Sequence, residues 1–357
     1  MKHLIIENLN SCETKYNAGS KARNDTIQIL KNLNFNILPV NTKKPNAKNT
    51  ILKLFYYFRY KKNSKIFQKE LSKLFDKDSV FIQYPLTIAC INLDKILKQY
   101  NRSLDIIILI HDLDSIRRKF DTNTNLLQKI RFFLRDKNVL KSATYIISHN
   151  AKMTKELINL GADENKIINL EIFDYIYDGL LAKVEKNSGI IIAGNLEPKK
   201  AGYLSELKNL KNVNFNLYGA NFDDKCLGEN ISYKGKFLPD ELIPNLEGSF
   251  GLVWDGNALD KCNGAWGEYL KFNNPHKTSL YIAAGLPVII WKKAALSEFI
   301  VKNNLGIAVD SLYELEDRLK NISDEEYAKM LDSVKVFSQK IRNGEFLKNA
   351  LAKIIKD

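Results

Sequence analysis

Buried-strand patterns alternate with helical patterns along the whole chain, and this alternation limits the possible folds more than any other feature. In the first half, apolar runs of strand length are separated by segments with helical periodicity. These runs lie at 3–8, 34–40, 80–85, 105–112, 143–150 and 166–173. Strands that are continuously apolar and joined through helices predict a parallel sheet that is covered on both faces.

The second half repeats the arrangement, with apolar runs at 189–195, 214–220, 250–256, 286–292 and 305–310. Residues 174–188 between the two sets have weak periodicity and end in polar residues. At 357 residues the chain is too long for one ordinary core. We therefore predict two Rossmann-like, doubly wound α/β domains, at 1–175 and 188–337, that face a central cleft where ligands bind beyond the carboxyl ends of the strands.

The closing segment is helical in pattern and is interrupted near Asn343 and Gly344. A terminal helix at about 338–357 could cross back and pack on the first domain.

The positive charge is concentrated in the first half of the chain. Residues 1–180 contain 30 Lys and Arg against 18 Asp and Glu, whereas the remaining residues contain 24 against 23. Within the first half, residues 43–73 carry ten basic residues against Glu70 alone, and the aromatic run ILKLFYYFRY lies among them. This combination suits the headgroup layer of an anionic inner leaflet, and it would also suit stacking on RNA. A solvated helix with its aromatics in the core is the third interpretation.

The apolar runs are far shorter than the roughly 18 residues that a membrane-spanning helix needs. The chain opens with Lys2 and His3 leading straight into a strand-like run, which does not resemble a secretory leader. We therefore expect a cytoplasmic protein that attaches at most peripherally to the inner face of the membrane. The four cysteines show no CxxC spacing, so we expect reduced thiols and no metal site.

The stretch NNPHKTSLYIAAGLPVIIWK, residues 273–292, predicts a helix that feeds a buried strand. Asn274 can cap the helix, Pro275 suits its first position, and Gly285 is a stop signal. Lys277, Thr278 and Ser279 then fall in the first turn, where free N–H groups and the helix dipole favour an anion. The preferred ligand is a phosphate group, and the alternative is a surface helix whose Lys277 simply faces water.

Other strand ends of the second half carry polar and small residues that would lie at the same edge of a parallel sheet. Small residues let a ligand approach the backbone, and lysines can meet a second phosphate oxygen. The set comprises Gly194, Asn195, Lys199 and Lys200 in GNLEPKK, Tyr233 and Lys234 in YKGKF, and Asp255 in FGLVWDG. A diphosphate therefore fits better than a single phosphate.

The segments GSFGLVWDG and GEYLKFNNPHKTSLYIAAGLPVIIWKKAALSEFIVKNNLGIAV resemble the donor-binding half of bacterial GT-B glycosyltransferases. The resemblance is strongest to the β-1,6-galactofuranosyltransferases of O-antigen and capsule assembly. It extends to the glucosyltransferases that lengthen O-glycans on serine-rich streptococcal adhesins. It is dense over 248–310, recognisable at GNLEPKK and YKGKF, and reaches the first domain through LIHDLDSIR.

This resemblance implies that the second domain binds a UDP-sugar and that the first domain binds an acceptor glycan. The expected reaction is transfer of galactofuranose from UDP-galactofuranose in cell-surface polysaccharide synthesis, to an acceptor that could be linked to a polyprenyl diphosphate. The alternative is transfer from UDP-glucose to a protein O-glycan. By position, Lys277 and Ser279 would contact the diphosphate with help from Lys199, and Tyr233 would lie near the nucleotide. Because no acid occurs between Glu268 and Glu298, ribose recognition is assigned to Glu298.

GT-B enzymes typically stabilise the leaving group with basic residues and a helix terminus, so we expect neither a metal nor a cofactor. An inverting enzyme also needs a base that faces the cleft from the first domain. His111 and Asp112 follow the strand IIILI, and Glu13 lies after the first strand. We predict Asp112, His111 or Glu13 as the base, with Asp114 as a further possibility, and Arg117 and Asp114 as acceptor contacts. A structural histidine tied to Asp112 is the other interpretation of His111.

Two alternatives come from other classes of protein. A nucleotide-responsive binding protein would keep the diphosphate site without transferring a sugar, and an RNA-binding protein would use residues 43–73. The favoured interpretation includes no nucleic-acid partner and is compatible with a homo-oligomer.

Overall fold

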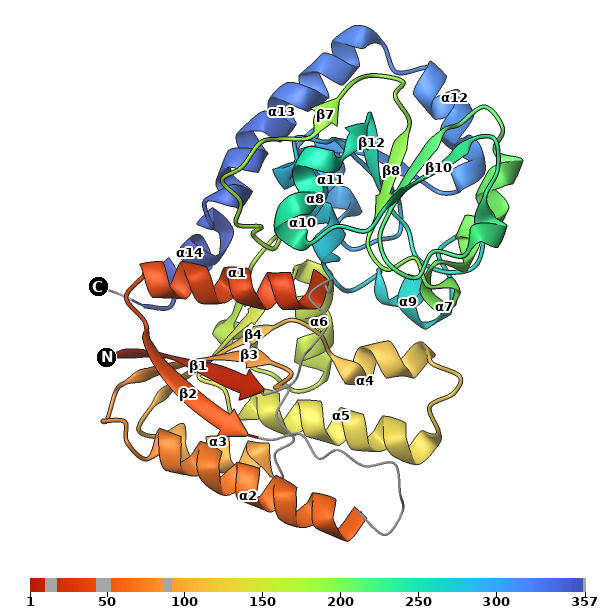
Figure 1. Ribbon diagram of the computed structural model, residues 1–357. Helices are drawn as coiled ribbons and strands as arrows, with labels where there is room; N and C mark the ends of the chain where they lie inside the picture. Colours follow the sequence, from red (N-terminus) through yellow and green to blue (C-terminus); the bar gives the residue numbers. More distant parts are fainter. Residues whose placement is uncertain (10–17, 43–52, 87–91, 356–357) are drawn as a thin grey trace.

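The computed structural model describes residues 1–9, 18–42, 53–86 and 92–355, and it consists of two α/β domains stacked on one another (Figure 1). Each domain is built on a six-stranded parallel sheet, as the alternation of strand and helix patterns predicts. Glu13 and the first ten residues of the basic segment 43–73 lie outside the described residues.

The sheet of the first domain has the order β2-β1-β3-β4-β5-β6. This order reverses direction between β1 and β3, which creates a switch point at the carboxyl ends of those strands. Its strands are β1 (Lys2–Leu9), β2 (Asn36–Thr42), β3 (Ser79–Tyr84), β4 (Asp105–Ile110), β5 (Tyr145–Ser148) and β6 (Ile167–Asn169).

Successive side chains of these strands enter two different cores. In β4, Ile106, Ile108 and Ile110 pack on one face of the sheet, while Ile107 and Leu109 pack on the other. Because side chains along a strand alternate between faces, a strand that is apolar at every position must be covered on both sides. One cover contains α2, α3, α5 and α6, and the other contains α1 together with parts of the second domain.

The helices of the first domain lie in the connections between its strands, as parallel pairing requires. They are α1 (Ala18–Asn32), α2 (Lys53–Leu71), α3 (Leu93–Tyr100), α4 (Asp114–Arg117), α5 (Leu126–Lys141) and α6 (Ala151–Asn159).

The second domain has the sheet order β10-β9-β8-β12-β13-β14, so the direction reverses between β8 and β12. Five of these strands were predicted, but the edge strand β10 was not, because its buried residues are few. The strands are β8 (Ile190–Ala193), β9 (Phe215–Tyr218), β10 (Ile231–Gly235), β12 (Phe250–Val253), β13 (Val288–Trp291) and β14 (Gly306–Val309). A short pair, β7 (Lys183–Val184) and β11 (Glu247–Gly248), lies beside them.

Helices again connect these strands and cover the second sheet (Figure 1). They are α7 (Pro198–Ala201), α8 (Pro239–Asn245), α9 (Gly264–Tyr269), α10 (His276–Ala283), α11 (Ser297–Lys302), α12 (Leu315–Lys320) and α13 (Asp324–Arg342).

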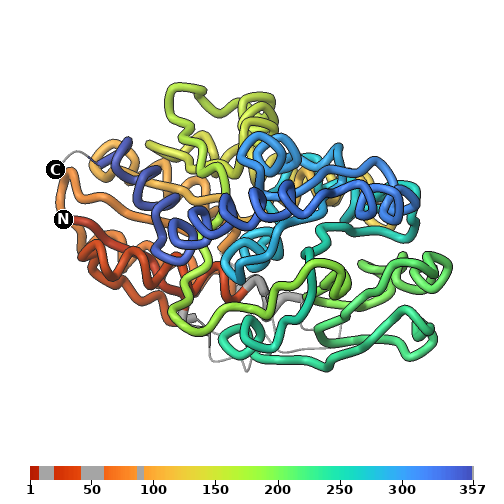
Figure 2. Tube along the Cα trace, turned by 90° about the horizontal axis from the view of Figure 1, so that it is seen from above, coloured from red at the N-terminus to blue at the C-terminus, as the bar shows by residue number. Residues whose placement is uncertain are grey.

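The end of the chain returns to the first domain. Helix α13 packs on α10 in the second domain, and α14 (Glu345–Ala352) then contacts α1. Figures 1 and 2 both show these helices passing from one domain to the other. Asp174, in the linker, accepts hydrogen bonds from the N–H groups of Phe346 (3.1 Å) and Leu347 (2.8 Å) and so caps the start of α14. Among the described residues, no helix is long and apolar enough to cross a bilayer.

Candidate active site at the domain junction

The candidate site lies where the carboxyl ends of the two sheets approach each other. In the second domain, Gly194 follows β8 and Asp255 follows β12, on either side of the switch point of that sheet. In the first domain, His111 and Asp112 follow β4. Helix α9 of the second domain packs against α4 of the first, which brings these strand ends together.

Gly194 and Gly219 let two of these strand ends pass closely. Gly219 has φ of +151°, and a Cβ there would lie 1.7 Å from the carbonyl oxygen of Gly194. A Cβ on Gly194, whose φ is +135°, would meet no described atom within 4 Å. Packing therefore requires a glycine at Gly219, whereas Gly194 leaves space above the end of β8.

Helix α10 begins one residue later than predicted and is not capped by Asn274. Pro275 is the N-cap residue, and Asn274 instead joins the two domains. Its side chain donates to the carbonyls of His149 (2.8 Å) and Glu171 (3.0 Å), and its Oδ1 accepts from Asn150 (2.7 Å). This correction has a physical reason: the amide is turned toward three partners in the other domain and therefore away from the N–H groups of its own helix.

Lys277 turns inward from the first turn of α10 rather than toward water. Its ammonium donates to the carboxylate of Asp255 at 2.9 Å and to the carbonyl of Trp254 at 3.1 Å. Thr278 and Ser279 are buried beside it. The charged group of the turn therefore lies at the end of β12, among the strand ends where ligands bind in such sheets.

Lys200 brings a second ammonium to this region, whereas Lys199, to which the resemblance assigns a diphosphate contact, points to solvent. Lys199 is exposed, whereas the ammonium of Lys200 lies 5.2 Å from the ring centre of Trp266. Asp255 raises the pKa of Lys200, but burial and the charge of Lys277 outweigh it, so the pKa of Lys200 is lowered overall. The two lysines point in different directions because neighbouring residues of a helix such as α7 differ in direction by about 100°.

Arg117 of the first domain reaches the same indole. Its guanidinium lies 5.2 Å from the ring centre of Trp266, within cation–π range. It also forms ion pairs with Asp112 at 3.6 Å and Asp114 at 2.6 Å. We call the resulting group the junction cluster, and it consists of Asp112, Arg117, Lys200, Asp255, Trp266 and Lys277.

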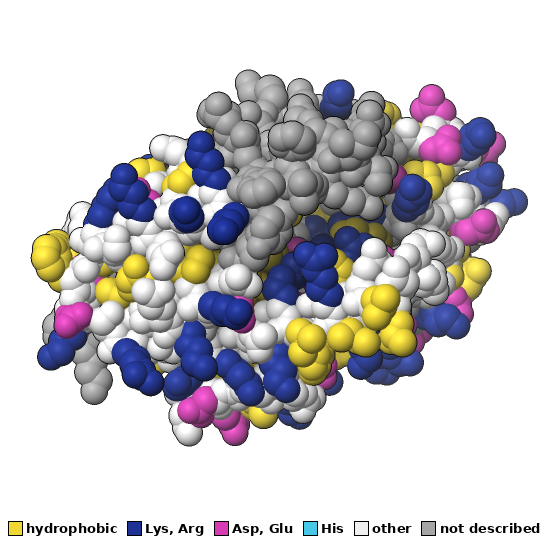
Figure 3. Space-filling model, turned by 90° about the horizontal axis from the view of Figure 1, so that it is seen from below, with side chains coloured by type: hydrophobic (Ala, Val, Ile, Leu, Met, Phe, Trp, Pro, Cys, Tyr) yellow, Lys and Arg dark blue, Asp and Glu magenta, His cyan; other side chains and the backbone are white. Residues whose placement is uncertain are grey.

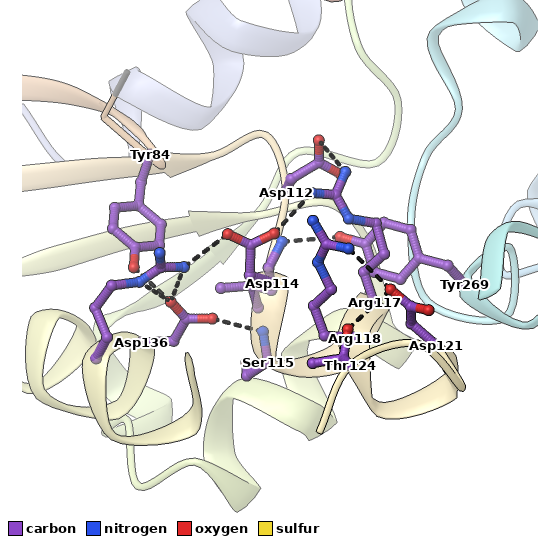
Figure 4. Close-up of polar contacts among 12 residues, drawn as sticks. Tyr84, Asp112, Asp114, Ser115, Arg117, Arg118, Asp121, Thr124, Asp136 and Tyr269 are labelled. Atoms are coloured by element: carbon purple, nitrogen blue, oxygen red, sulfur yellow. Dashed lines mark hydrogen bonds and ion pairs between the residues drawn. The ribbon is translucent and has the colours of Figure 1, made fainter. Parts of the chain in front are cut away.

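Asp114 supports this cluster and is poorly placed to bind an acceptor or to act as a base. Its carboxylate accepts hydrogen bonds from Arg117, labelled with it in Figure 4, and from Arg135 at 2.9 Å. Burial opposes the negative charge, but hydrogen bonds from Arg135 and the charge of Arg117 outweigh it and lower the pKa of Asp114. In the structure Asp114 holds Arg117, and its contact with an acceptor stays a prediction.

The two base candidates that the structure describes differ in their surroundings. His111 bonds to Gln83 at 2.7 Å and stacks on Phe173 at 5.4 Å, and burial lowers its pKa well below the usual value. The tie to Asp112, which the alternative interpretation of His111 required, is absent among its described contacts. The side chain of Asp112 is 39% exposed, and its pKa is raised by burial and by the charge of Asp114 despite the opposing charge of Arg117.

Tyr269 and Trp266 are site residues that the sequence interpretation missed. The hydroxyl of Tyr269 accepts a 2.9 Å hydrogen bond from the N–H of Leu113, directly after Asp112, and so connects α9 to the end of β4. Both aromatics lie in CNGAWGEYLKF, where large rings in a glycine-containing segment are a signal that could have drawn attention.

The remaining predicted donor residues have no described contact with the junction cluster. Asn195 is exposed and accepts a hydrogen bond from Asn221 (2.8 Å), and Tyr233 stacks on Phe222 at 4.5 Å while its hydroxyl donates to Gly219. Glu298 is exposed in the first turn of α11. Across the described ranges, no group of three His, Cys, Asp or Glu side chains is arranged to hold a metal ion.

Comparison with protein families identifies both domains. Residues 3–172 match the N-terminal domain of the glucosyltransferase 3-like family, and residues 190–354 match its C-terminal domain. The chain is 35% identical over 296 residues to the β-1,6-galactofuranosyltransferase WbbI of Escherichia coli K12, covering 80% of this chain and 82% of the relative. It is 27% identical over 350 residues to glucosyltransferase 3 of Streptococcus gordonii, covering 92% of each.

Solved structures share the fold at low sequence identity. The lipopolysaccharide outer core galactosyltransferase WaaB superposes with a TM-score of 0.60 at 11% identity, covering 99% of this chain and 100% of WaaB. HepE of Anabaena, solved with UDP, superposes with a TM-score of 0.56 at 11% identity, covering 99% of this chain and all of HepE. The two-domain arrangement is therefore the GT-B fold, as predicted.

Proposed function

The chain belongs to the glucosyltransferase 3-like family of glycosyltransferases, and we propose that it transfers galactofuranose from UDP-galactofuranose to a glycan acceptor in cell-surface polysaccharide synthesis. The observation that carries the choice of sugar is the 35% identity, over four fifths of the chain, to a β-1,6-galactofuranosyltransferase. Binding of a UDP-sugar is further supported by HepE, a protein of the same fold that was solved with UDP.

The proposed diphosphate site consists of Lys277 and Lys200, together with the N–H groups that open α10. Two ammonium groups and a helix N-terminus suit the charge of a nucleoside diphosphate. The hydroxyl oxygen of Thr278 is buried without a hydrogen-bond partner among the described residues, which fits a group that would meet a ligand oxygen. Ser279, Gly194 and Asn195 are proposed to line the donor site.

Asp255 is proposed to orient the two lysines, since it pairs with Lys277 and is the strongest charge acting on Lys200. Tyr233 is proposed to lie near the uracil base and Glu298 near the ribose, while Lys199 would approach the diphosphate only from its rim.

Asp112 is the proposed general base, since its raised pKa makes its carboxylate more basic than usual and its side chain is partly exposed. It would remove the proton from the acceptor hydroxyl as that oxygen attacks the anomeric carbon and UDP departs, which inverts the configuration. Arg117 is proposed to position the acceptor. The cations of the junction cluster would stabilise the charge on the departing UDP, so that no metal is required.

Transfer of glucose from UDP-glucose to a protein O-glycan is the second candidate. It is favoured by the match of both domains to the glucosyltransferase 3-like family and by coverage of 92% of the streptococcal glucosyltransferase.

Turnover assays with each donor and a glycan acceptor would distinguish the two proposals. We expect turnover of UDP-galactofuranose that persists in EDTA, with the β-anomer as product. Preferred turnover of UDP-glucose would favour the second candidate, and loss of activity in EDTA would overturn the metal-independent mechanism. If neither UDP nor another nucleoside diphosphate raises the melting temperature, the proposed donor site is wrong.

A further inference from the structure

Helix α5 has an apolar surface that the described residues of the chain leave exposed. Leu126 and Leu127 at its start are 72% and 78% exposed, although leucine is normally buried. Ile130, Phe133 and Leu134 are also exposed one and two turns later. Residues three and four apart share one face of a helix, so these side chains form a continuous strip, which we call the α5 face.

Residues near the end of α5 are buried in the first domain, so the helix is firmly packed although the α5 face is exposed. Val139 and Leu140 enter the core of the first domain, and Asp136 is fully buried. Asn125 and Gln128 form a capping box at the start of the helix. The helix is therefore capped at its start and packed into the core near its end. In the outward strip, the ring of Phe133 meets the ammonium of Lys137 from the same helix at 5.7 Å.

Positive charge surrounds the α5 face. Residues 117–141 contain eight Lys and Arg and two acids, Asp121 and Asp136. Both acids are already paired, the first with Arg118 and the second with Arg135, each at 2.8 Å. Figure 3 views the molecule from the side where α2 and α5 lie, and it shows hydrophobic side chains gathered among Lys and Arg side chains.

We propose that the α5 face docks the protein onto an anionic lipid surface. Leucine, isoleucine and phenylalanine side chains would enter the boundary between headgroups and acyl chains, while Lys129, Arg131 and Lys137 meet the anionic headgroups. A contact between two copies of this chain fits less well, because lysine is depleted in protein interfaces. Single-stranded nucleic acid is disfavoured because binding it relies on aromatic platforms, and this strip is mainly aliphatic.

Docking through α5 would bring the lipid surface close to the first-domain side of the site. Arg135, on the same helix, holds Asp114, which in turn holds Arg117. A short segment containing Asp121 and Thr124 connects Arg117 to the start of α5. The docking of the α5 face on a lipid surface does not depend on the proposed function. Only the orientation of a lipid-linked acceptor toward the site rests on it.

The described part of the basic segment 43–73 offers charge without apolar surface. Lys61, Lys62 and Lys65 are exposed on α2, but Phe67 and Leu71 are buried. The aromatic side chains at 55–58 lie outside the described residues. For the described residues, therefore, α5 and not α2 combines exposed apolar groups with cations.

Flotation of the full-length chain with vesicles tests the proposal. The wild type should float with vesicles of phosphatidylcholine and phosphatidylglycerol, and less with phosphatidylcholine alone. A Leu126→Ser, Leu127→Ser, Ile130→Ser variant should lower the bound fraction roughly tenfold or more, because its apolar contact is removed. A Val301→Ser, Val336→Ser variant, which changes exposed apolar residues of the second domain, is the matched control and should float as the wild type does.

The melting temperature and UDP binding of each variant show separately that the fold and the donor site are intact. The proposal is overturned if the wild type does not float, if the triple serine variant floats as well as the wild type, or if only a Lys61→Gln, Lys62→Gln, Lys65→Gln variant loses binding. Light scattering that shows a wild-type dimer and a monomeric triple variant, without flotation of either, would instead assign the α5 face to a second copy.

Discussion

Lys277 and Asp255 form a 2.9 Å ion pair that joins the first turn of α10 to the end of β12. Both side chains are largely buried, so a loss of either partner leaves the other charge poorly compensated. The pair fixes the ammonium at the carboxyl edge of the sheet, where a diphosphate can replace part of its hydrogen bonding.

Replacing Lys277 with Ala should weaken UDP binding. A charge-assisted hydrogen bond contributes about 1.5–3 kcal/mol, so the dissociation constant measured by calorimetry should rise roughly 10- to 100-fold. Lys292→Ala is the matched control, since its ammonium pairs with Asp310 at 2.7 Å on the surface. An unchanged dissociation constant in a folded Lys277→Ala variant would remove this residue from the donor site.

Lys200→Ala and Lys199→Ala form a test with adjacent residues. Lys200 lies over Trp266 and Lys199 is exposed, so only the first change should raise the KM for the donor, by about tenfold. Steady-state kinetics on both variants checks this. Equal effects would show that α7 contributes general positive charge rather than one directed ammonium.

Asp112→Asn should lower kcat by roughly 10²–10⁴-fold, because the proposed base is removed while the shape is kept. A base works deprotonated, so kcat/KM should fall as pH decreases through the raised pKa of Asp112, above its ordinary value of 3.8. His111→Gln should keep this acid limb. If the limb instead disappears in His111→Gln and remains in Asp112→Asn, the roles are reversed.

The strands were predictable because burial on both faces makes a run such as IIILI apolar at every position, a pattern that depends on local sequence alone. The edge strand β10 was missed because only one of its neighbours is a strand and most of its side chains are not buried. Its pairing with β9 depends on backbone hydrogen bonds, which do not require a pattern of apolar side chains in the sequence.

The junction cluster was predictable only in part. Lys277 and Asp255 follow from helix-start and strand-end signals, but the choice between Lys199 and Lys200 depends on how α7 is turned. The sequence did not show that Arg135, 21 residues away, bonds to the carboxylate of Asp114. Contacts of this kind arise from tertiary packing, and spacing along the chain does not reveal them.

Asn274→Ala should destabilise the protein, because the side chain makes three hydrogen bonds across the domain junction, two of them buried and one partly buried. Leaving the carbonyls of His149 and Glu171 without this donor should cost about 2–4 kcal/mol of the free energy of unfolding, measured in urea. Asn212→Ala, which removes an exposed bond to Glu316, should change it by less than about 0.5 kcal/mol. A similar small effect at Asn274 would show that the junction does not depend on this amide.

The contribution of two buried carboxyl groups, Asp25 and Asp174, to the stability of the fold should fall as pH rises from about 4 to about 7. Burial is the main cause that raises the pKa of Asp25 from 3.8 to about 6 and that of Asp174 to about 7. Between pH 3.8 and these pKa values, the folded state binds more protons at the two carboxyl groups than the unfolded state does. The stabilisation that these groups contribute is therefore complete below pH 3.8, and it is lost as pH rises through their folded pKa values. Asp25→Asn removes one of the two titrating groups. One carboxylate oxygen of Asp25 has no hydrogen-bond partner among the described residues, so the substitution breaks no described hydrogen bond at that atom. The free energy of unfolding of this variant, minus that of the wild type, should therefore increase by up to about 3 kcal/mol between pH 4 and pH 7 in urea titrations. The same difference at every pH would show that Asp25 does not titrate in this range.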